Sequence, residues 1–243
     1  MRHVLNVVIM AFTVAIVVLF TSVVLELVKF ARSSSDKAVT RILIWPKLSG
    51  GAGNDLPMAW YPMFQKIDGV KVVQCQKFMF GRIPNGPTYI ISGEEESGVD
   101  LNRDIFPVEQ DVFEAWKKER PLGAIVTETT AKELNLQIGQ VTEVPTGFGP
   151  LKLKIVGFSK GGLVARRIAP HFDYLQQFAG NSGTCIYRLF VAPSDYERVA
   201  RAVLEQTKNS PTPAQAMSDA QLSESWARSV SAVPTLLGFL GLF

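Results

Sequence analysis

The chain has 243 residues, enough for one large domain or two small ones. Its 25 Lys and Arg residues nearly balance its 22 Asp and Glu residues, which argues against a dedicated nucleic-acid binder. Two cysteines exclude a disulfide-rich scaffold and a multi-cysteine zinc site. The apolar fraction of 47% is ordinary for a soluble domain, but much of it lies within residues 1–30.

The first feature in the chain is an uncharged apolar run at residues 7–25. A helix of this length is roughly 28 Å long, close to the hydrocarbon thickness of a bilayer, and predicts a transmembrane helix within residues 1–30. The hydroxyls of Thr13, Thr21 and Ser22 can donate to the preceding turn and are tolerated in lipid. A cleaved signal peptide and a buried soluble helix are the alternatives, and the length of the run favours the span.

The positive charges around this run leave its orientation open. Arg2 and the amino terminus precede it, whereas Lys29, Arg32, Lys37 and Arg41 follow it. Counting these charges places the following domain in the cytoplasm, but long domains are translocated largely regardless of charge.

The last residues form a second apolar segment. Residues 230–243 carry no charge, and at roughly 21 Å of helix they are too short to cross a bilayer. The pattern favours residues 229–243 as the start of a second transmembrane segment, with a tail docked into a core as the alternative. Trp226 suits either a membrane interface or burial in the domain.

The first half of the body contains apolar β-branched runs and turn signals. These predict strands at residues 38–45, 70–80 and 88–92, and a helix at 57–67 with Pro62 near its beginning. A turn is expected at residues 82–87, and an acidic loop at 93–104. Glu94, Glu95 and Glu96 in that loop could bind a cation, but a solvated loop is the preferred interpretation.

The second half continues with helices and strands in turn. Val112, Phe113 and Trp116 have helical spacing and predict a helix at residues 108–120. Thr130 and Ser194 are each followed three residues later by Glu, a capping-box pattern that predicts helix starts. The helix from Ser194 is expected to reach residue 207. Further strands are expected at residues 123–126, 141–144, 151–158 and 184–191, a break at 209–213, and a polar helix at 218–229.

Motifs for chemistry are absent from the sequence. There is no phosphate-binding loop, no Gly-x-Ser-x-Gly elbow and no set of metal ligands at suitable spacing. His171 precedes Asp173 but has no activated serine, so a surface or capping histidine is expected. Cys75 and Cys185 lie in predicted strands, and both pairing and two separate buried thiols remain open. We therefore predict no catalytic, cofactor-binding or metal-binding residue, and no enzyme.

Four stretches of the chain form recognisable local motifs. They are Ile67-Asp68-Gly69-Val70, Ala124-Ile125-Val126-Thr127, Ala131-Lys132-Glu133-Leu134-Asn135-Leu136-Gln137-Ile138-Gly139 and Ile155-Val156-Gly157-Phe158. In these stretches the sequence resembles the MacB-type, or FtsX-like, ABC transporter permease family. The resemblance covers nearly the whole chain, and its motifs are structural rather than catalytic.

The resemblance implies an α+β fold. In order, it implies an N-terminal transmembrane helix, an extracytoplasmic mixed α/β subdomain interrupted by a β-rich subdomain, and the start of a second transmembrane helix. The implied periplasmic core domain spans residues 31–228, with the α/β subdomain at 33–82 and 166–228 and the β-rich subdomain at 83–165. Residues 25–30 and 218–229 would be the connecting stalks.

The resemblance also implies a role and partners. A separate ATPase subunit binds ATP and moves the membrane helices, and the outer domain transmits that movement to export, lipoprotein release or activation of a partner. The implied location is the bacterial inner membrane with the main domain in the periplasm. Implied partners are the lipid bilayer, the ABC ATPase, a second permease copy or homologue and a periplasmic adaptor, but no nucleic acid.

Two other functions compete with this expectation. The first is a membrane-anchored extracytoplasmic binding or scaffold protein without transport activity, and the second is a membrane-anchored hydrolase that uses His171. The family has further spans and a cytoplasmic loop that meets the ATPase, and this sequence does not contain them. It is therefore expected to be a truncated permease, a fragment or one piece of a split permease.

Overall fold

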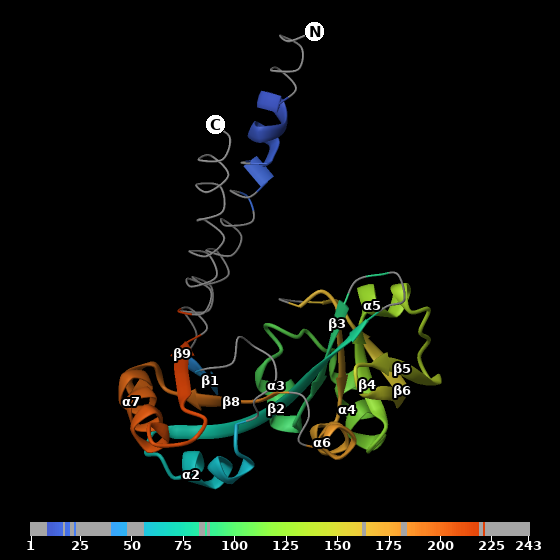
Figure 1. The fold of residues 1–243 in the computed structure, drawn as a ribbon. Helices are drawn as coiled ribbons and strands as arrows, with labels where there is room; N and C mark the ends of the chain where they lie inside the picture. The colour runs from blue at the N-terminus through green and yellow to red at the C-terminus, as the bar shows by residue number, and fades with distance from the viewer. Residues whose placement is uncertain are drawn as a thin grey trace.

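The computed structural model describes residues 9–16, 18, 19, 22, 40–47, 56–82, 86, 88–161, 164–180, 184–218 and 221. Within these residues the fold is α+β, as predicted, and is built on a nine-stranded mixed sheet of order β5-β6-β4-β7-β3-β2-β8-β1-β9 (Figure 1). The strands are β1 Thr40–Pro46, β2 Val70–Arg82, β3 Thr88–Gly93, β4 Gly123–Thr127, β5 Val141–Thr146, β6 Gly149–Ser159, β7 Arg167–Pro170, β8 Thr184–Val191 and β9 Ala214–Ser218. The helices are η1 Met58–Trp60, α2 Tyr61–Gln65, α3 Glu96–Leu101, α4 Gln110–Lys118, α5 Glu128–Glu133, α6 Phe172–Ala179, η2 Pro193–Asp195 and α7 Tyr196–Thr207.

The long strand β2 joins two parts of the fold. Its first part pairs with β8, and its last part, from Lys77 to Arg82, pairs with β3. We call β9, β1, β8 and the first part of β2, with α2 and α7, the proximal lobe. We call the strands β3, β7, β4, β6 and β5 and the last part of β2, with α4, α5 and α6, the distal lobe (Figure 1). A single sheet therefore runs through both lobes.

Each lobe has its own hydrophobic core. In the proximal lobe, Phe64 of α2 and Val203 of α7 pack on one face of the sheet. In the distal lobe, β4 separates two cores: Ile125 faces Trp116 of α4, whereas Val126 faces Leu175 of α6. This alternation is the period-two pattern of a strand buried on both faces. The predicted subdomain boundaries at residues 83 and 166 stay a prediction.

Most predicted elements in the described residues are present. The predicted helix at residues 108–120 is present as α4, which buries Phe113 and Trp116 and packs the partly buried Val112 against the same core, and the break at residues 209–213 follows α7. Lys117 and Lys118 lie in the last turn of α4, where positive charge complements the helix dipole. Pro62 occupies the first turn of α2, as predicted, and the strands predicted at residues 141–144 and 151–158 are present as β5 and β6, which pair antiparallel.

Three expectations for local structure are wrong. Residues 96–101 form α3 rather than a loop, and both predicted capping boxes fail. The helix α5 begins at Glu128 and ends at Glu133, so Thr130 lies inside it, where its hydroxyl bonds that of Thr127 at 3.0 Å. At α7, the 3-10 turn η2 already includes Ser194, so the N-cap moves to Asp195. The strand β9 and the pair β7 and α6 were not predicted.

The predicted membrane segments lie largely outside the described residues. Residues 9–16, 18, 19 and 22 are helical, and Thr13 and Ser22 donate to the carbonyls of Ile9 and Val18 at 2.9 Å, as expected for hydroxyls in an apolar helix. No helix among the described residues is both long and apolar enough to cross a bilayer. Residues 229–243 fall outside the described residues, as do residues 83–85 and 87 of the turn predicted at 82–87.

Candidate functional site

A buried carboxylate lies where the two lobes meet. Glu94 follows β3, is 1% exposed, and accepts hydrogen bonds from Gln74 Nε2 at 2.7 Å and Ser92 Oγ at 2.6 Å. Gln76 also donates to it, and the guanidinium of Arg167 on β7 forms an ion pair with it. A buried charge is tolerated only when it is paired and hydrogen-bonded, and Glu94 has both kinds of partner.

This set of bonds continues into the proximal lobe. Asn102, which follows α3, donates to Gln74 Oε1 at 3.0 Å and accepts from Arg41 Nη1 at 3.4 Å. Arg41 is the second residue of β1, and its two terminal nitrogens donate to the two oxygens of Asp104 at 2.8 and 2.9 Å. Such bidentate pairs fix geometry as well as charge. We call this chain of bonds, from Arg41 through Asn102, Gln74 and Glu94 to Arg167, the junction network.

Arg167 anchors the distal end of the network. Its guanidinium carbon lies 4.2 Å from the centre of the Phe106 ring, a cation–π arrangement. Its backbone N–H donates to Thr127 Oγ1 at 3.0 Å, which ties β7 to the end of β4. Within the described residues, the network therefore contacts five strands or their ends and the segment after α3.

The acidic run at residues 94–96 does not form the solvated loop that we expected. Glu94 is buried, Glu95 is half-buried and Glu96 begins α3. The described residues contain no group of three or more His, Cys, Asp or Glu side chains placed to hold a metal ion. The carboxylate of Glu94 is instead neutralised by an arginine from a strand more than seventy positions later.

Glu95, the next residue, bonds to the backbone of β2, the strand that also carries Gln74 and Gln76. Its Oε2 accepts the backbone N–H of Cys75 at 3.2 Å. Burial raises the pKa of this carboxyl from 4.5 to about 7, and the nearby Asp173 and Glu94 carboxylates add to the rise, although the bond from Cys75 opposes it. Glu95 therefore changes its charge near neutral pH.

We predict that Glu95 makes the folded protein less stable as the pH rises. Because its pKa is higher in the folded state than in the unfolded chain, the folded state holds more protons between about pH 4.5 and 7, and stability falls across that window. Glu95→Gln keeps an acceptor and removes the charge. Thermal unfolding should show a larger gain in Tm for this variant at about pH 8 than at about pH 5. A gain that is equal at both pH values, or equal to that of the exposed neighbour Glu96→Gln, would contradict the prediction.

His171 occupies the N-cap position of α6, in line with the expected capping histidine, but its side chain makes no capping bond and does not lie at the surface. It is 1% exposed, stacks on Trp116 with ring centres 3.9 Å apart, and places Nε2 at 2.9 Å from the Trp116 carbonyl oxygen. A carbonyl only accepts, so Nε2 carries the proton. Burial lowers the pKa of this imidazole to about 4. A neutral ring whose N–H is bonded to the backbone explains the histidine as part of the distal core.

The structure brings together some of the residues singled out in the sequence. Cys75 on β2 and Cys185 on β8 meet in the proximal core, with their Sγ atoms 2.7 Å apart. The network residues Gln74, Gln76 and Arg167 were missed. Two glutamines that alternate with apolar residues in a strand predicted to be buried were the available signal, because buried amides need partners.

The fold and the junction network together define the class of domain to which the described residues belong. It is a two-lobed α+β domain on one mixed sheet, whose conspicuous polar cluster is a buried linkage rather than an open cleft with a nucleophile or a ligand set. Among solved structures, the extracellular domain of the noncanonical ABC-type transporter YknZ from Gram-positive bacteria has this fold, with a TM-score of 0.50, 16% identity, and coverage of 73% of this chain and 99% of that one. The periplasmic region of MacB from Actinobacillus actinomycetemcomitans matches with a TM-score of 0.49 and 11% identity, covering 76% of this chain and 91% of that one. No family model and no curated protein matches the sequence.

Proposed function

We propose that this chain is a permease component of an ABC transport system. Its outer domain transmits movement that a separate ATPase drives, and it catalyses no reaction itself. The observation that carries this proposal is the position of the two ends of the domain. The first strand, β1, begins at Thr40 and the last, β9, ends at Ser218, and the two are antiparallel neighbours with Ile42 opposite Ser218 (Figure 1).

This arrangement suits a domain that is moved from one side. The chain enters the domain through β1 and leaves it through β9, and these two strands are neighbours at one edge of the sheet. A displacement of the segments before β1 and after β9 would therefore act on this edge. Domain movements of this kind are rigid-body rotations about a few connecting residues.

The junction network supplies a path from that edge to the distal lobe. Arg41 lies next to the start of β1, and its ion pair with Asp104 connects the entry strand directly to the segment after α3. From there the bonds reach Gln74, Glu94 and Arg167 without leaving the interior. Packed cores and bonded networks deform little, so a movement of β1 is passed on to the distal lobe instead of being absorbed between the lobes.

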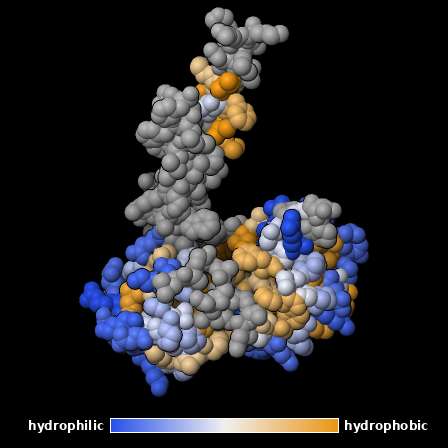
Figure 2. Space-filling view, viewed as in Figure 1, coloured by the Kyte–Doolittle hydropathy of each residue, from blue (hydrophilic) through white to orange (hydrophobic). Residues whose placement is uncertain are grey.

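The helical residues near the amino terminus support a membrane location. Six large apolar side chains there are 54–70% exposed, and Figure 2 shows them as an orange surface; they are Ile9, Met10, Phe12, Val14, Val18 and Leu19. Apolar surface on several sides of one helix requires an apolar environment, and lipid provides it. The helix alone does not fix the side of the membrane on which the domain lies, and we propose the periplasm or its extracellular equivalent because the domain has the fold of the extracellular domain of YknZ.

The proposal includes partners that this chain would need. ATP would bind to a separate ABC ATPase, and a second permease copy or homologue would complete the membrane part. A periplasmic adaptor is a further proposed partner of the outer domain. The output would be export of a substrate, release of a lipoprotein or activation of an envelope protein.

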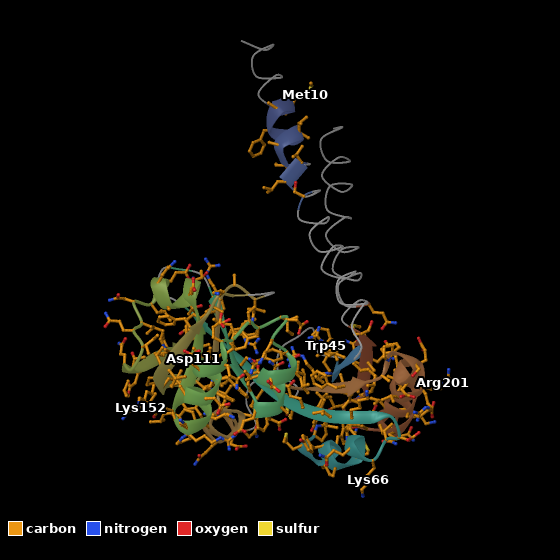
Figure 3. The ribbon with its side chains drawn as sticks, turned by 180° about the vertical axis from the view of Figure 1, so that it is seen from behind. Met10, Trp45, Lys66, Asp111, Lys152 and Arg201 are labelled. Atoms are coloured by element: carbon orange, nitrogen blue, oxygen red, sulfur yellow. The ribbon has the colours of Figure 1, made fainter. Side chains whose placement is uncertain are left out.

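Labelling from outside the cell tests the location of the domain. Lys152 is an exposed residue of β6 at the far end of the distal lobe, opposite Arg201 (Figure 3). We expect a membrane-impermeant maleimide to label Lys152→Cys in intact cells, whereas the native chain stays unlabelled because Cys75 and Cys185 are 0% and 1% exposed. Labelling that requires permeabilised cells would overturn the proposed location. Purification of the same variant in detergent should also recover an ABC ATPase, which a scaffold protein would not bind.

A further inference from the structure

Two sulfur atoms meet in the core of the proximal lobe. Cys75 on β2 and Cys185 on β8 have their Sγ atoms 2.7 Å apart, closer than the about 3.5–4.0 Å that separates ordinary non-bonded carbon atoms. A disulfide has an S–S bond of about 2.03–2.05 Å, so little movement separates the present contact from a bond. The cysteines are diagonal neighbours, since Cys75 is opposite Tyr187 and Cys185 is opposite Lys77.

We propose that Cys75 and Cys185 are a redox pair that closes to a disulfide between β2 and β8. The two residues are 110 positions apart, and almost the whole distal lobe lies between them in the sequence. The disulfide would therefore cross-link the chain where it leaves the proximal lobe and where it returns. This goes beyond the proposed function and depends on it only for the source of the oxidant in the cell.

On one side, the partly exposed Met58 side chain lies between the two sulfur atoms and the solvent. Met58 of η1 places its Sδ at 3.5 Å from Cys75 Sγ and 3.7 Å from Cys185 Sγ, and Met58 itself is 40% exposed. A small local opening of η1 would bring a reagent to the pair, because short helices at the surface open most easily. Tyr187 hydroxyl, which donates to the Pro57 carbonyl at 2.8 Å, holds this segment in place.

The proposed reaction is thiol–disulfide exchange with a low-molecular-mass or protein disulfide. The thiolate of one cysteine attacks a sulfur of the oxidant, which gives a mixed disulfide and releases one thiol of the oxidant. The second cysteine then attacks the mixed disulfide as its thiolate, and the second thiol of the oxidant leaves. Two protein thiols are oxidised, one disulfide of the oxidant is reduced, and two protons pass to the released thiolates. Extracytoplasmic compartments contain such oxidants.

Oxidised glutathione tests the pair directly on the purified full-length chain. The protein is incubated with oxidised glutathione at a urea concentration below the unfolding transition. It is then denatured in the presence of iodoacetamide, which alkylates any remaining thiol, and digested. We expect the peptides of Cys75 and Cys185 to be joined and neither cysteine to be alkylated. Closure of so long a loop should raise the Tm by roughly 10 °C over the reduced protein. Two alkylated cysteines, or one glutathione retained on a single cysteine, would overturn the proposal.

Serine variants show whether the reagent reaches the sulfurs. In Cys75→Ser and in Cys185→Ser the remaining cysteine should retain one glutathione, and the rise in Tm should disappear. Alkylation of intact cells is a separate arm that concerns the location. Cysteines that are thiols in cells but close with oxidised glutathione would contradict the extracytoplasmic location under Proposed function, while the redox pair itself would stand.

Discussion

Replacing Arg167 with Met is expected to lower the free energy of unfolding by about 3–5 kcal/mol, because the Glu94 carboxylate would be left buried without its countercharge. The Met side chain has a similar length and fills much of the space, so the loss of charge dominates the loss of volume. Urea denaturation followed by circular dichroism checks this result. For a domain of this size the Tm should also fall by roughly 10 °C.

The neighbouring arginine provides a matched control. Arg166 forms an ion pair with Glu133 at 2.7 Å, but its side chain is 38% exposed. Water screens an exposed ion pair, so Arg166→Met should change the stability far less than Arg167→Met. The double variant Glu94→Gln with Arg167→Met removes both charges and keeps polar groups for Gln74 and Gln76, and it should recover most of the lost stability. Equal losses in Arg167→Met and Arg166→Met would show that the buried pair has no special role.

Trp116→Ala is expected to cost about 3–5 kcal/mol of folding free energy. Trp116 is 0% exposed, stacks on His171 and lies near Phe113, with ring centres 6.1 Å apart, so its removal leaves a cavity between α4 and β4. The exposed Phe148→Ala is the control, and it should change stability by less than about 0.5 kcal/mol. A loss below 1 kcal/mol in Trp116→Ala would mean that the distal core is not packed as described.

Both variants test the rigidity on which the proposed transmission of movement depends. Arg167 lies in the junction network, and Trp116 lies in the distal core. A permease that retains its membrane location but loses output in Arg167→Met would implicate the linkage between the lobes. The same loss in Trp116→Ala would follow from a softened distal lobe.

The sequence pattern was sufficient for the elements that depend on local chemistry. Alternation and β-branched residues correctly predicted β2 and β8, and the helix predicted to reach residue 207 is present as α7, although it begins after Ser194. The short strand β7, Arg167–Pro170, was missed because four residues with an arginine and a proline give a weak strand signal. Phe172 and Leu175 do have helical spacing, so α6 could have been found.

The candidate site was harder to predict because its members are distant in sequence. Glu94 and Arg167 come together because β3 pairs in parallel with β7, and the strands β4, β5 and β6 lie between these two strands in the sequence. An acidic run and a pair of adjacent arginines, taken separately, are both typical of solvated surface. The contact of Cys75 with Cys185 likewise follows from strand register, which the sequence leaves open.

Nucleotide-dependent movement of the outer domain tests the central claim most directly. A fluorophore on Lys152→Cys and acceptors on lipid headgroups would report the distance of the distal lobe from the bilayer, with the full chain reconstituted in vesicles together with its co-purified ATPase. We predict that trapping the ATPase with ATP and vanadate changes the energy transfer, and that a catalytically inactive ATPase abolishes the change. Energy transfer that stays the same throughout the ATPase cycle would contradict the account and favour a static scaffold.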